Sequence, residues 1–191
     1  MPFSINEFKA QIRGDLARKS HFIVYVHPKG QSTDGAALQF RAERTNLPGR
    51  ALATADNQIF GPIRQFAHNQ TFEDLTLDII LSPDYREKQL FERWQDVAIG
   101  KARGINGPRE GMWDVGYYDD YVSTIEIKTF DDNGTEKFQL KLIEAYPKTV
   151  GVVALDWGSD DIARLPVTFA YRYYIDEEDG FYPAPSANTA S

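Results

Sequence analysis

The chain has 191 residues, of which 42% are hydrophobic and none is cysteine. This length corresponds to one domain, and the lack of cysteine excludes disulfide bonds, thiol catalysis and iron–sulfur clusters. The 28 acidic residues outnumber the 21 basic ones, and the formal charge of −7 is opposite in sign to that of a dedicated nucleic-acid-binding protein. The sequence has no signal-peptide pattern and no run of about 18 apolar residues, so we expect neither export by a signal peptide nor membrane insertion.

The first part of the chain predicts one short helix and four strands. Apolar residues at helical spacing favour a helix over residues 5–12. The apolar run at 21–27 favours a strand buried on both faces, and the alternation at 38–43 and 75–81 favours strands with one apolar face. The mixed stretch at 57–66 is predicted as a further strand, although a Gly-Pro pair interrupts it.

The clearest helix spans residues 83–99. Ser82 is suited to cap its start, Pro83 to its first position and Gly100 to end it in a left-handed conformation. One helical face, expected to pack on a sheet, carries the apolar residues Leu90, Phe91, Trp94, Val97 and Ala98. The following segment, 100–120, contains five glycines and no clear period, which indicates either a functional loop or an interface arm.

The strongest hairpin signal joins strands at 121–129 and 136–145 through a turn at 131–134. Its apolar face would contain Ile125, Ile127, Phe138, Leu140 and Leu142. Its opposite, polar face would contain Thr124, Glu126, Lys128, Gln139 and Lys141. A last strand is expected at 166–175, before an acidic and flexible tail at 176–191.

These seven strands and two helices predict an α+β domain of mainly antiparallel β-structure over residues 1–175. The expected architecture is a β-barrel or sandwich with a flanking helix and an extended loop at 100–120. A doubly wound parallel sheet is excluded, because the crossover helices that it needs are missing.

The polar residues form no recognisable catalytic or metal-binding pattern. His21 and His27 would lie on one strand face roughly 20 Å apart, which is too far to share an ion. Asp114, Asp119 and Asp120 match no EF-hand loop, and the nearby glycines lack the Gly-Lys-Ser/Thr of a phosphate loop. We therefore predict no enzymatic activity, no cofactor and no metal ion.

Four segments, taken in order along the chain, resemble the tail tube proteins of contractile-tailed bacteriophages. They read DLARKSHFIVYV, RAERTNLPG, QTFEDLTLDIIL leading into DYREKQLFERWQDVAIG, and EAYPKTVGVVALDWGSDD. The most telling residues lie in the last segment and are Pro147, Gly151, Leu155, Asp156 and Trp157. The sequence departs from the family pattern at 100–120, which is longer, and in the acidic tail after Ile175.

This resemblance implies a structural virion protein with the tail tube β-barrel fold and a flanking helix. Such proteins form hexameric rings that stack into the inner tail tube, assemble in the host cytoplasm and conduct DNA non-specifically during ejection. The implied partners are the tail sheath protein, the tape measure protein, and the baseplate and tail terminator proteins. A tube-initiating baseplate or junction protein, or a secretion-system tube protein, would share the fold, and an enzyme or ligand-binding β-domain is the remaining alternative.

Two sets of residues are candidates for contacts in such a tube. The candidates for the lumen are Gln39, Arg41, Glu43, Glu126, Lys128, Gln139 and Lys141, which lie on polar strand faces that either line the channel or face solvent outside it. The candidates for contacts between subunits or rings are Leu47 and Pro48 in the loop at 44–56, and Met112, Trp113, Tyr117 and Tyr118 in the glycine-rich segment. The second set would either anchor a neighbouring subunit or fold back over the core of its own.

Overall fold

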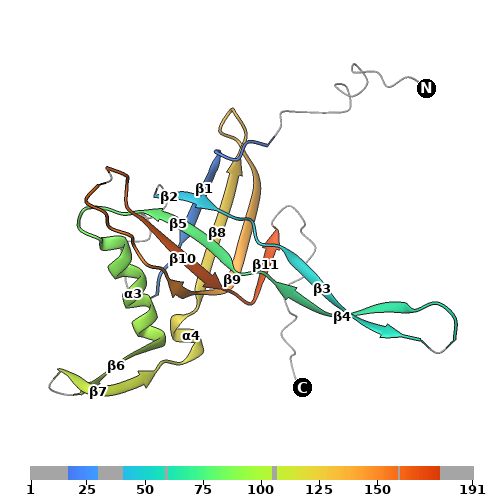
Figure 1. Cartoon of the computed structure of the whole chain (residues 1–191), viewed down its shortest axis with the longest axis horizontal. Helices are drawn as coiled ribbons and strands as arrows, with labels where there is room; N and C mark the ends of the chain where they lie inside the picture. Colours follow the sequence, from blue (N-terminus) through green and yellow to red (C-terminus); the bar gives the residue numbers. More distant parts are fainter. Residues whose placement is uncertain (1–16, 30–40, 59, 105–106, 159, 177–191) are drawn as a thin grey trace, which may run out of the picture.

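Two antiparallel sheets that share one strand enclose the core, and two hairpins project from it (Figure 1). The computed structural model describes residues 17–29, 41–58, 60–104, 107–158 and 160–176, without the side chains of 101–112. The helix expected at 5–12 and the tail at 177–191 lie outside the described residues. The mainly antiparallel fold with a flanking helix is confirmed.

The first sheet has the strand order β1 (Phe22–Val26), β8 (Ser123–Phe130), β9 (Glu136–Val150) and β11 (Tyr173–Asp176). The second sheet continues from the far half of β9 to β10 (Arg164–Ala170), β5 (Leu75–Ile80) and β2 (Ala42–Thr45). The hairpin predicted between β8 and β9 is therefore confirmed. Its turn is held by the Asp131 carboxylate, which accepts hydrogen bonds from the backbone amides of Asn133 and Thr135 at 2.9 and 2.8 Å.

The shared strand β9 changes sheets at Glu144. Residues up to 145 pair with β8, whereas Tyr146 to Val150 pair with β10. Glu144 has a φ of 56°, a left-handed conformation that costs a residue with a Cβ on the order of 1–3 kcal/mol. Its carboxylate accepts a hydrogen bond from the Tyr118 hydroxyl at 3.1 Å and from Arg172 at 3.0 Å, so two other elements hold the bend.

The core lies between the two sheets and is closed on one side by helix α3 (Arg86–Ala98) (Figure 1). Leu90, Phe91 and Trp94 of the predicted apolar face are buried, and Phe91 and Trp94 contact the Phe169 ring at centroid distances of 5.8 and 6.1 Å. The Trp94 indole N–H donates to the Tyr121 carbonyl at 2.6 Å. The sheets contribute Val24, Val26, Leu75, Leu77, Ile79, Ile125, Ile127, Leu140, Leu142, Leu165, Val167 and Phe169.

The start of α3 differs from the sequence prediction. The helix begins at Arg86, and the capping position is Tyr85, which makes no side-chain capping bond. Ser82 is three residues too early to cap, and instead it donates its amide to the Glu87 carboxylate at 2.9 Å and its hydroxyl to the same carboxylate. Arg41 lies 3.1 Å from this carboxylate, so the buried Glu87 joins the residue before β2, the turn before the helix, and the helix itself.

The glycine-rich segment folds as a second hairpin rather than as a loop. It forms β6 (Ile99–Gly104), β7 (Gly107–Val115) and the short helix α4 (Tyr118–Tyr121). Gly100 does not cap the helix in a left-handed conformation, because it pairs with Asp114 inside this hairpin. A Cβ at Gly100 would lie 2.2 Å from the Asp96 carbonyl oxygen, so the position requires glycine for close approach.

Two further strand predictions are wrong. The stretch 57–66 is not a strand, because it contains the turn between β3 (Arg50–Asn57) and β4 (Arg64–Phe72), with Gly61 at a φ of 87°. The loop expected at 44–56 is consequently mostly strand β3. The single strand expected at 166–175 is two strands, since the chain leaves the second sheet after Ala170 and joins the first one at Tyr173.

Replacing Trp94 by alanine should lower the free energy of unfolding by about 3–5 kcal/mol, because a buried indole and its hydrogen bond are lost. Trp157 is a matched control: its side chain is fully exposed, and its replacement by alanine should change the stability by less than about 0.5 kcal/mol. Urea denaturation of the dispersed protein measures both. Equal effects of the two variants would contradict the assigned core.

The Glu87 site should make stability depend on pH. Burial raises the pKa of Glu87, but the hydrogen bonds from Ser82 and the charge of Arg41 outweigh it, so the pKa lies below its ordinary value of 4.5. The carboxylate therefore stabilises the fold above pH 4.5, and this contribution is lost as the pH falls through the lowered pKa. E87Q should cost about 1–3 kcal/mol at neutral pH and much less under acid conditions.

The control for this prediction is E92Q, which removes a carboxylate from the exposed side of the same helix. It should have little effect at either pH, because exposed ion pairs contribute about 0–1 kcal/mol. A loss of stability in E87Q that stays the same at neutral and acid pH would show that the Glu87 charge is not what matters.

Candidate assembly surfaces

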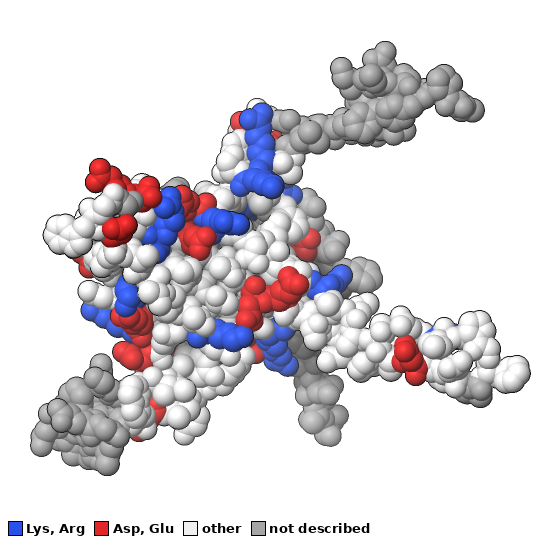
Figure 2. Space-filling model, in the orientation of Figure 1, with Lys and Arg blue, Asp and Glu red and all other residues white. Residues whose placement is uncertain are grey.

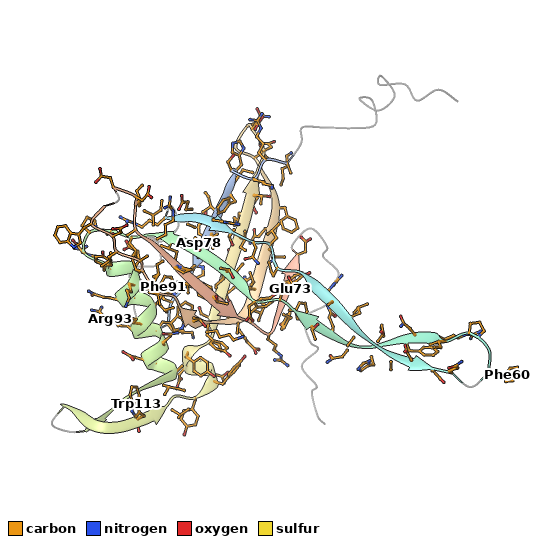
Figure 3. The ribbon with its side chains drawn as sticks, viewed as in Figure 1. Phe60, Glu73, Asp78, Phe91, Arg93 and Trp113 are labelled. Carbon is orange, nitrogen blue, oxygen red and sulfur yellow. The ribbon has the colours of Figure 1, made fainter. Side chains whose placement is uncertain are left out.

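The longest projection of the molecule is the hairpin of β3 and β4, called here the first arm (Figure 1). Nearly all of its side chains are exposed, and four of them are large and apolar: Leu52, Phe60, Ile63 and Phe66. Figure 3 places Phe60 at the far end of the arm, away from the core residue Phe91, and Phe60 is 100% exposed. An isolated two-stranded hairpin is marginally stable in water, so contact with another surface would stabilise this arm.

The base of the first arm is fixed to the sheets. The Glu73 amide donates to the Gly49 carbonyl at 3.1 Å, and the Tyr171 hydroxyl donates to the Glu73 carbonyl at 2.7 Å. The Phe72 ring packs against Tyr171 and Tyr174. Burial, followed by the nearby Tyr174, raises the pKa of Tyr171 to about 12, so its hydroxyl remains a donor at neutral pH. The direction of the arm is thus set by the fold.

Leu47 and Pro48, which were predicted to contact a neighbouring subunit, lie just before this base. Pro48 is buried inside its own subunit, whereas Leu47 is exposed. The apolar residues of the arm beyond them were not predicted. The sequence does not reveal these strands, because neither of their faces is buried and apolar residues therefore do not alternate with polar ones along them.

The hairpin of β6 and β7 is called the second arm, and it lies at the other side of the molecule, beside α3 (Figure 1). The predicted contact residues Trp113 and Tyr117 are exposed, as Figure 3 shows for Trp113. Tyr118 is also exposed, at 44%, and within its own subunit it bonds Glu144 and packs on Tyr121. Met112 belongs to β7, but its side chain lies outside the described part of the structure.

The second arm is also anchored at its base. Gly116 donates its amide to the Ala98 carbonyl at 2.9 Å, and the Tyr121 ring stacks edge-on with Tyr146. Burial, together with the Glu144 carboxylate, raises the pKa of Tyr118 to about 12. Tyr118 therefore stays protonated and keeps its hydrogen bond to Glu144 at neutral pH.

Four of the predicted lumen residues come together on the outer face of β8 and β9. In the register of the two strands, Glu126 lies opposite Lys141 and Lys128 opposite Gln139. Lys141 is 3.4 Å from the Glu126 carboxylate, and the Gln139 amide donates to the same carboxylate at 3.5 Å. We call these four residues and Glu136 the charged ladder, since Lys128 lies 3.0 Å from Glu136.

The other predicted lumen residues do not join this ladder. Glu43 lies on β2 in the second sheet and forms an ion pair with Arg164, whose hydrogen bond lowers the pKa of the Glu43 carboxyl. Arg41 precedes β2 and contacts the buried Glu87. Gln39 lies outside the described residues. The two predicted polar faces therefore belong to different sheets, and a channel wall formed by one sheet would contain only one of them.

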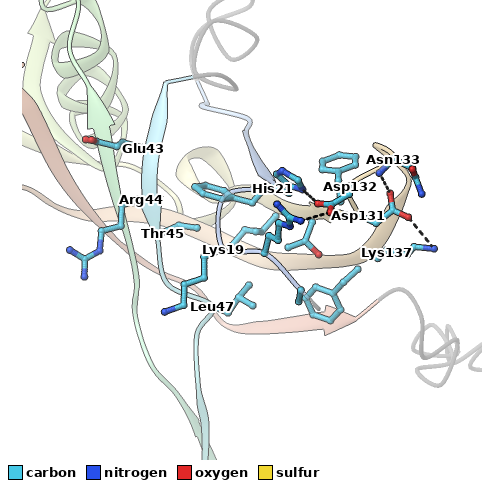
Figure 4. A pocket seen from close by; sticks show the side chains of 17 residues that line it. Lys19, His21, Glu43, Arg44, Thr45, Leu47, Asp131, Asp132, Asn133 and Lys137 are labelled. Carbon is cyan, nitrogen blue, oxygen red and sulfur yellow. Dashed lines mark hydrogen bonds and ion pairs between the residues drawn. The ribbon is translucent and has the colours of Figure 1, made fainter. Parts of the chain in front are cut away.

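A hollow of about 1160 Å³ opens between the start of β1, β2 and the turn of β8 and β9 (Figure 4). Apolar groups from Phe22, Leu47, Ile127 and Phe138 line it, and charged groups stand around it. On one side Arg18 and His21 contact Asp132 at 2.6 and 3.4 Å. In the part of the chain that the structure describes, no group of three or more His, Asp or Glu side chains could hold a metal ion.

A last exposed surface is the loop between β9 and β10, which contains Trp157. Val152, Leu155 and Trp157 are 89%, 74% and 107% exposed, and Figure 2 shows acidic side chains gathered at this corner. Both ends of the loop are fixed, because Gly151 donates to the Pro166 carbonyl at 2.7 Å and Leu81 to the Ala163 carbonyl at 3.1 Å. This segment carries the most telling residues of the family resemblance, and its exposure was not predicted.

No helix in the described ranges is long and apolar enough to cross a membrane. The described surface presents two anchored arms, a charged face of paired side chains and an exposed apolar loop.

Comparisons with known proteins agree with this arrangement. The chain is 24% identical over 163 residues to the tail tube protein gp19 of Enterobacteria phage T4 and to that of phage T6, and each match covers 84% of this chain and 92% of the relative. Among solved structures, a chain of the anti-feeding prophage baseplate has a TM-score of 0.59 at 14% identity, covering 86% of this chain and 97% of that one.

A chain of the sheath-tube complex of an extracellular contractile injection system has a TM-score of 0.58 at 15% identity, covering 92% of this chain and 98% of that one. At such low identity these two structures show the shared fold. The family model described as phage tail tube protein matches residues 5–177, which is most of the chain. This protein therefore belongs to the phage tail tube protein family, and it is a structural component of a contractile tail rather than an enzyme.

Proposed function

We propose that this protein forms hexameric rings that stack into the inner tube of the tail, and that phage DNA passes through this tube during ejection. The observation that carries the proposal is the first arm, which is anchored at its base and exposes four large apolar side chains along its length. Such an arm would cover a different part of the next copy rather than the same arm. A contact between two different surfaces of neighbouring copies is a head-to-tail contact. Head-to-tail contacts produce rings and open stacks rather than closed dimers.

Charge also favours contact between the first arm and another copy. Between residues 50 and 72 the arm carries Arg50 and Arg64 against one acidic residue, Asp56, while the whole chain has a charge of −7. The arm can therefore approach an acidic neighbour without like-charge repulsion. Its apolar side chains then supply the contact area.

We expect the edge strands of the sheets to close the ring. Among the described residues, β1 pairs with β8 alone and β2 with β5 alone. An unpaired strand edge exposes backbone hydrogen-bonding groups, and pairing with a different strand edge of a neighbouring subunit would satisfy them and continue the contact around a ring. Six such subunits would join their sheets into one closed barrel around a channel.

The proposed partners follow from this assembly. A sheath protein would surround the tube, the tape measure protein would occupy it before ejection, and baseplate and terminator proteins would bind its two ends. The similar solved structures support these contacts, since they come from a baseplate, a sheath-tube complex and a tube terminator. Assembly would take place in the host cytoplasm, and the tube would contact DNA only through non-specific encounters.

A second candidate is a tube-initiating baseplate or junction protein, which the similarity to a baseplate chain favours. A secretion-system tube protein is the corresponding alternative outside phages. Each would form rings, but an initiating protein would form single rings instead of long stacks.

Negative-stain electron microscopy of concentrated protein tests the proposal. We expect six-fold rings and hollow tubes, because the first arm leaves apolar surface uncovered in a single subunit. Single rings without tubes would favour the junction protein. A monomer in sedimentation at high concentration, even with other tail proteins present to nucleate assembly, would contradict ring formation.

Changing Phe60 to serine should shorten or abolish the tubes, because the side chain at the tip of the first arm loses its apolar contact with the next ring. The melting temperature of dispersed protein should stay the same, since Phe60 is 100% exposed there. Tube length in micrographs is the measurement. F60L is the control, since it keeps an apolar side chain at the same exposed position and should leave the tubes unchanged. Normal tubes from the serine variant would show that the tip makes no ring contact.

A further inference from the structure

Every lysine of β8 and β9 is paired with a carboxylate. The four lysines lie on both strands and at both ends of the long β9, yet none of the measured distances to a carboxylate oxygen exceeds 3.5 Å. The pairs are Lys128 with Glu136 at 3.0 Å, Lys137 with Asp131 at 3.5 Å, Lys141 with Glu126 at 3.4 Å, and Lys148 with Asp74 at 2.7 Å.

Two of these pairs form the charged ladder, and strand register creates them. Glu126 and Lys141 are direct cross-strand partners, so their side chains leave the same face of the sheet. The Gln139 amide occupies the other oxygen of Glu126, at 3.5 Å. Lys128 lies opposite Gln139, within reach of Glu136, and its ammonium stands 5.9 Å from the centre of the Tyr25 ring. The hydrogen bond to Glu136 raises the pKa of Lys128, which favours the charged ammonium.

Stability accounts for little of this pairing. Surface ion pairs contribute only about 0–1 kcal/mol to folding, and the side chains of the two ladder pairs, which are 21–40% exposed, keep partial contact with solvent. The pairing has a larger effect on charge, because it neutralises the two lysines that the face would otherwise present to a ligand. A free lysine binds a phosphate polymer mainly because counterions are released from the polymer, and a lysine already neutralised by a carboxylate offers little of that gain.

We propose that Glu126 and Glu136 prevent the outer face of β8 and β9 from binding nucleic acid, by occupying Lys141 and Lys128. The face is then polar and close to neutral, so a phosphate polymer neither adheres to it nor is strongly repelled by it. This inference rests on the proposed function only where it places the face along the DNA channel. The pairing itself is a property of the single subunit.

The test uses the full chain in dispersed form and a short fluorescent single-stranded oligonucleotide, with fluorescence anisotropy at about 50 mM salt. Wild-type protein should not bind. The double variant E126Q/E136Q should bind, because it frees two lysines on one face without changing side-chain size. The affinity should fall with salt, with a slope of log K against log salt of about −0.7 for each freed lysine, or about −1.4 for both.

The matched control is D119N/D120N, which makes the same change in net charge at two exposed carboxylates of α4 that form no ion pair among the described residues, so it frees no lysine or arginine. It should not bind the oligonucleotide. Equal binding by this control would overturn the proposal, since net charge alone would then explain the effect. Binding by the wild type, or no binding by E126Q/E136Q, would overturn it as well.

Two further measurements separate the possible failures. The single variants E126Q and E136Q, with their folding checked by circular dichroism, should each bind the oligonucleotide, more weakly than the double variant. They test the proposal if the double variant does not fold. Tubes assembled from the double variant should retain the oligonucleotide after washing. If dispersed protein binds the oligonucleotide but tubes do not retain it, the placement of this face in the lumen is wrong and the role of the ion pairs still holds. If the wild type forms no tubes, only the proposed function is contradicted.

Discussion

The fold depends on one strand that belongs to two sheets. β9 has 15 residues, and its change of partner from β8 to β10 requires the left-handed conformation of Glu144. The cost of that conformation is offset by hydrogen bonds from Tyr118 and Arg172, which come from the segments that enter and leave the bend region. The same carboxylate therefore connects α4, at the base of the second arm, to the turn before β11. Glycine would adopt the left-handed conformation more easily, but it has no side chain to accept the two hydrogen bonds that the glutamate accepts.

Rigidity at the bases of the arms follows from this closed core. Tyr171 and Phe72 attach the first arm to the strands beside β9, while Trp94 and Tyr121 attach the second arm to the helix. Each base combines ring packing with a hydrogen bond to a carbonyl group, so the direction of the arm is determined before any partner binds. Preorganised contact surfaces lose less conformational entropy on association than flexible ones. Apolar side chains on such arms can then contribute most of their burial energy to assembly.

The sequence predicted those parts of the structure that bury a face. Ile125 and Ile127 alternate with polar residues because one side of β8 lies in the core, and Phe91 and Trp94 recur at helical spacing because one side of α3 does. The arms were missed because both of their faces are exposed, which leaves no hydrophobic period to detect. Ser82 was misassigned for a different reason: a serine hydroxyl can donate to a carboxylate instead of accepting from a helix amide, and sequence does not show that Glu87 is buried. The lumen candidates on β8 and β9 were grouped correctly by alternation, whereas Glu43 required knowledge of sheet order.

Apolar and charged surfaces on this molecule have opposite consequences for binding. The apolar arms gain free energy when covered, and the first arm carries so little charge that an acidic copy does not repel it. The charged ladder behaves differently, because its ions already have partners and a ligand would have to replace them. A structural protein that binds its own copies tightly and a moving polymer weakly needs both kinds of surface. Here they occupy separate elements, the arms and the β8 and β9 face, so a change in one need not alter the other.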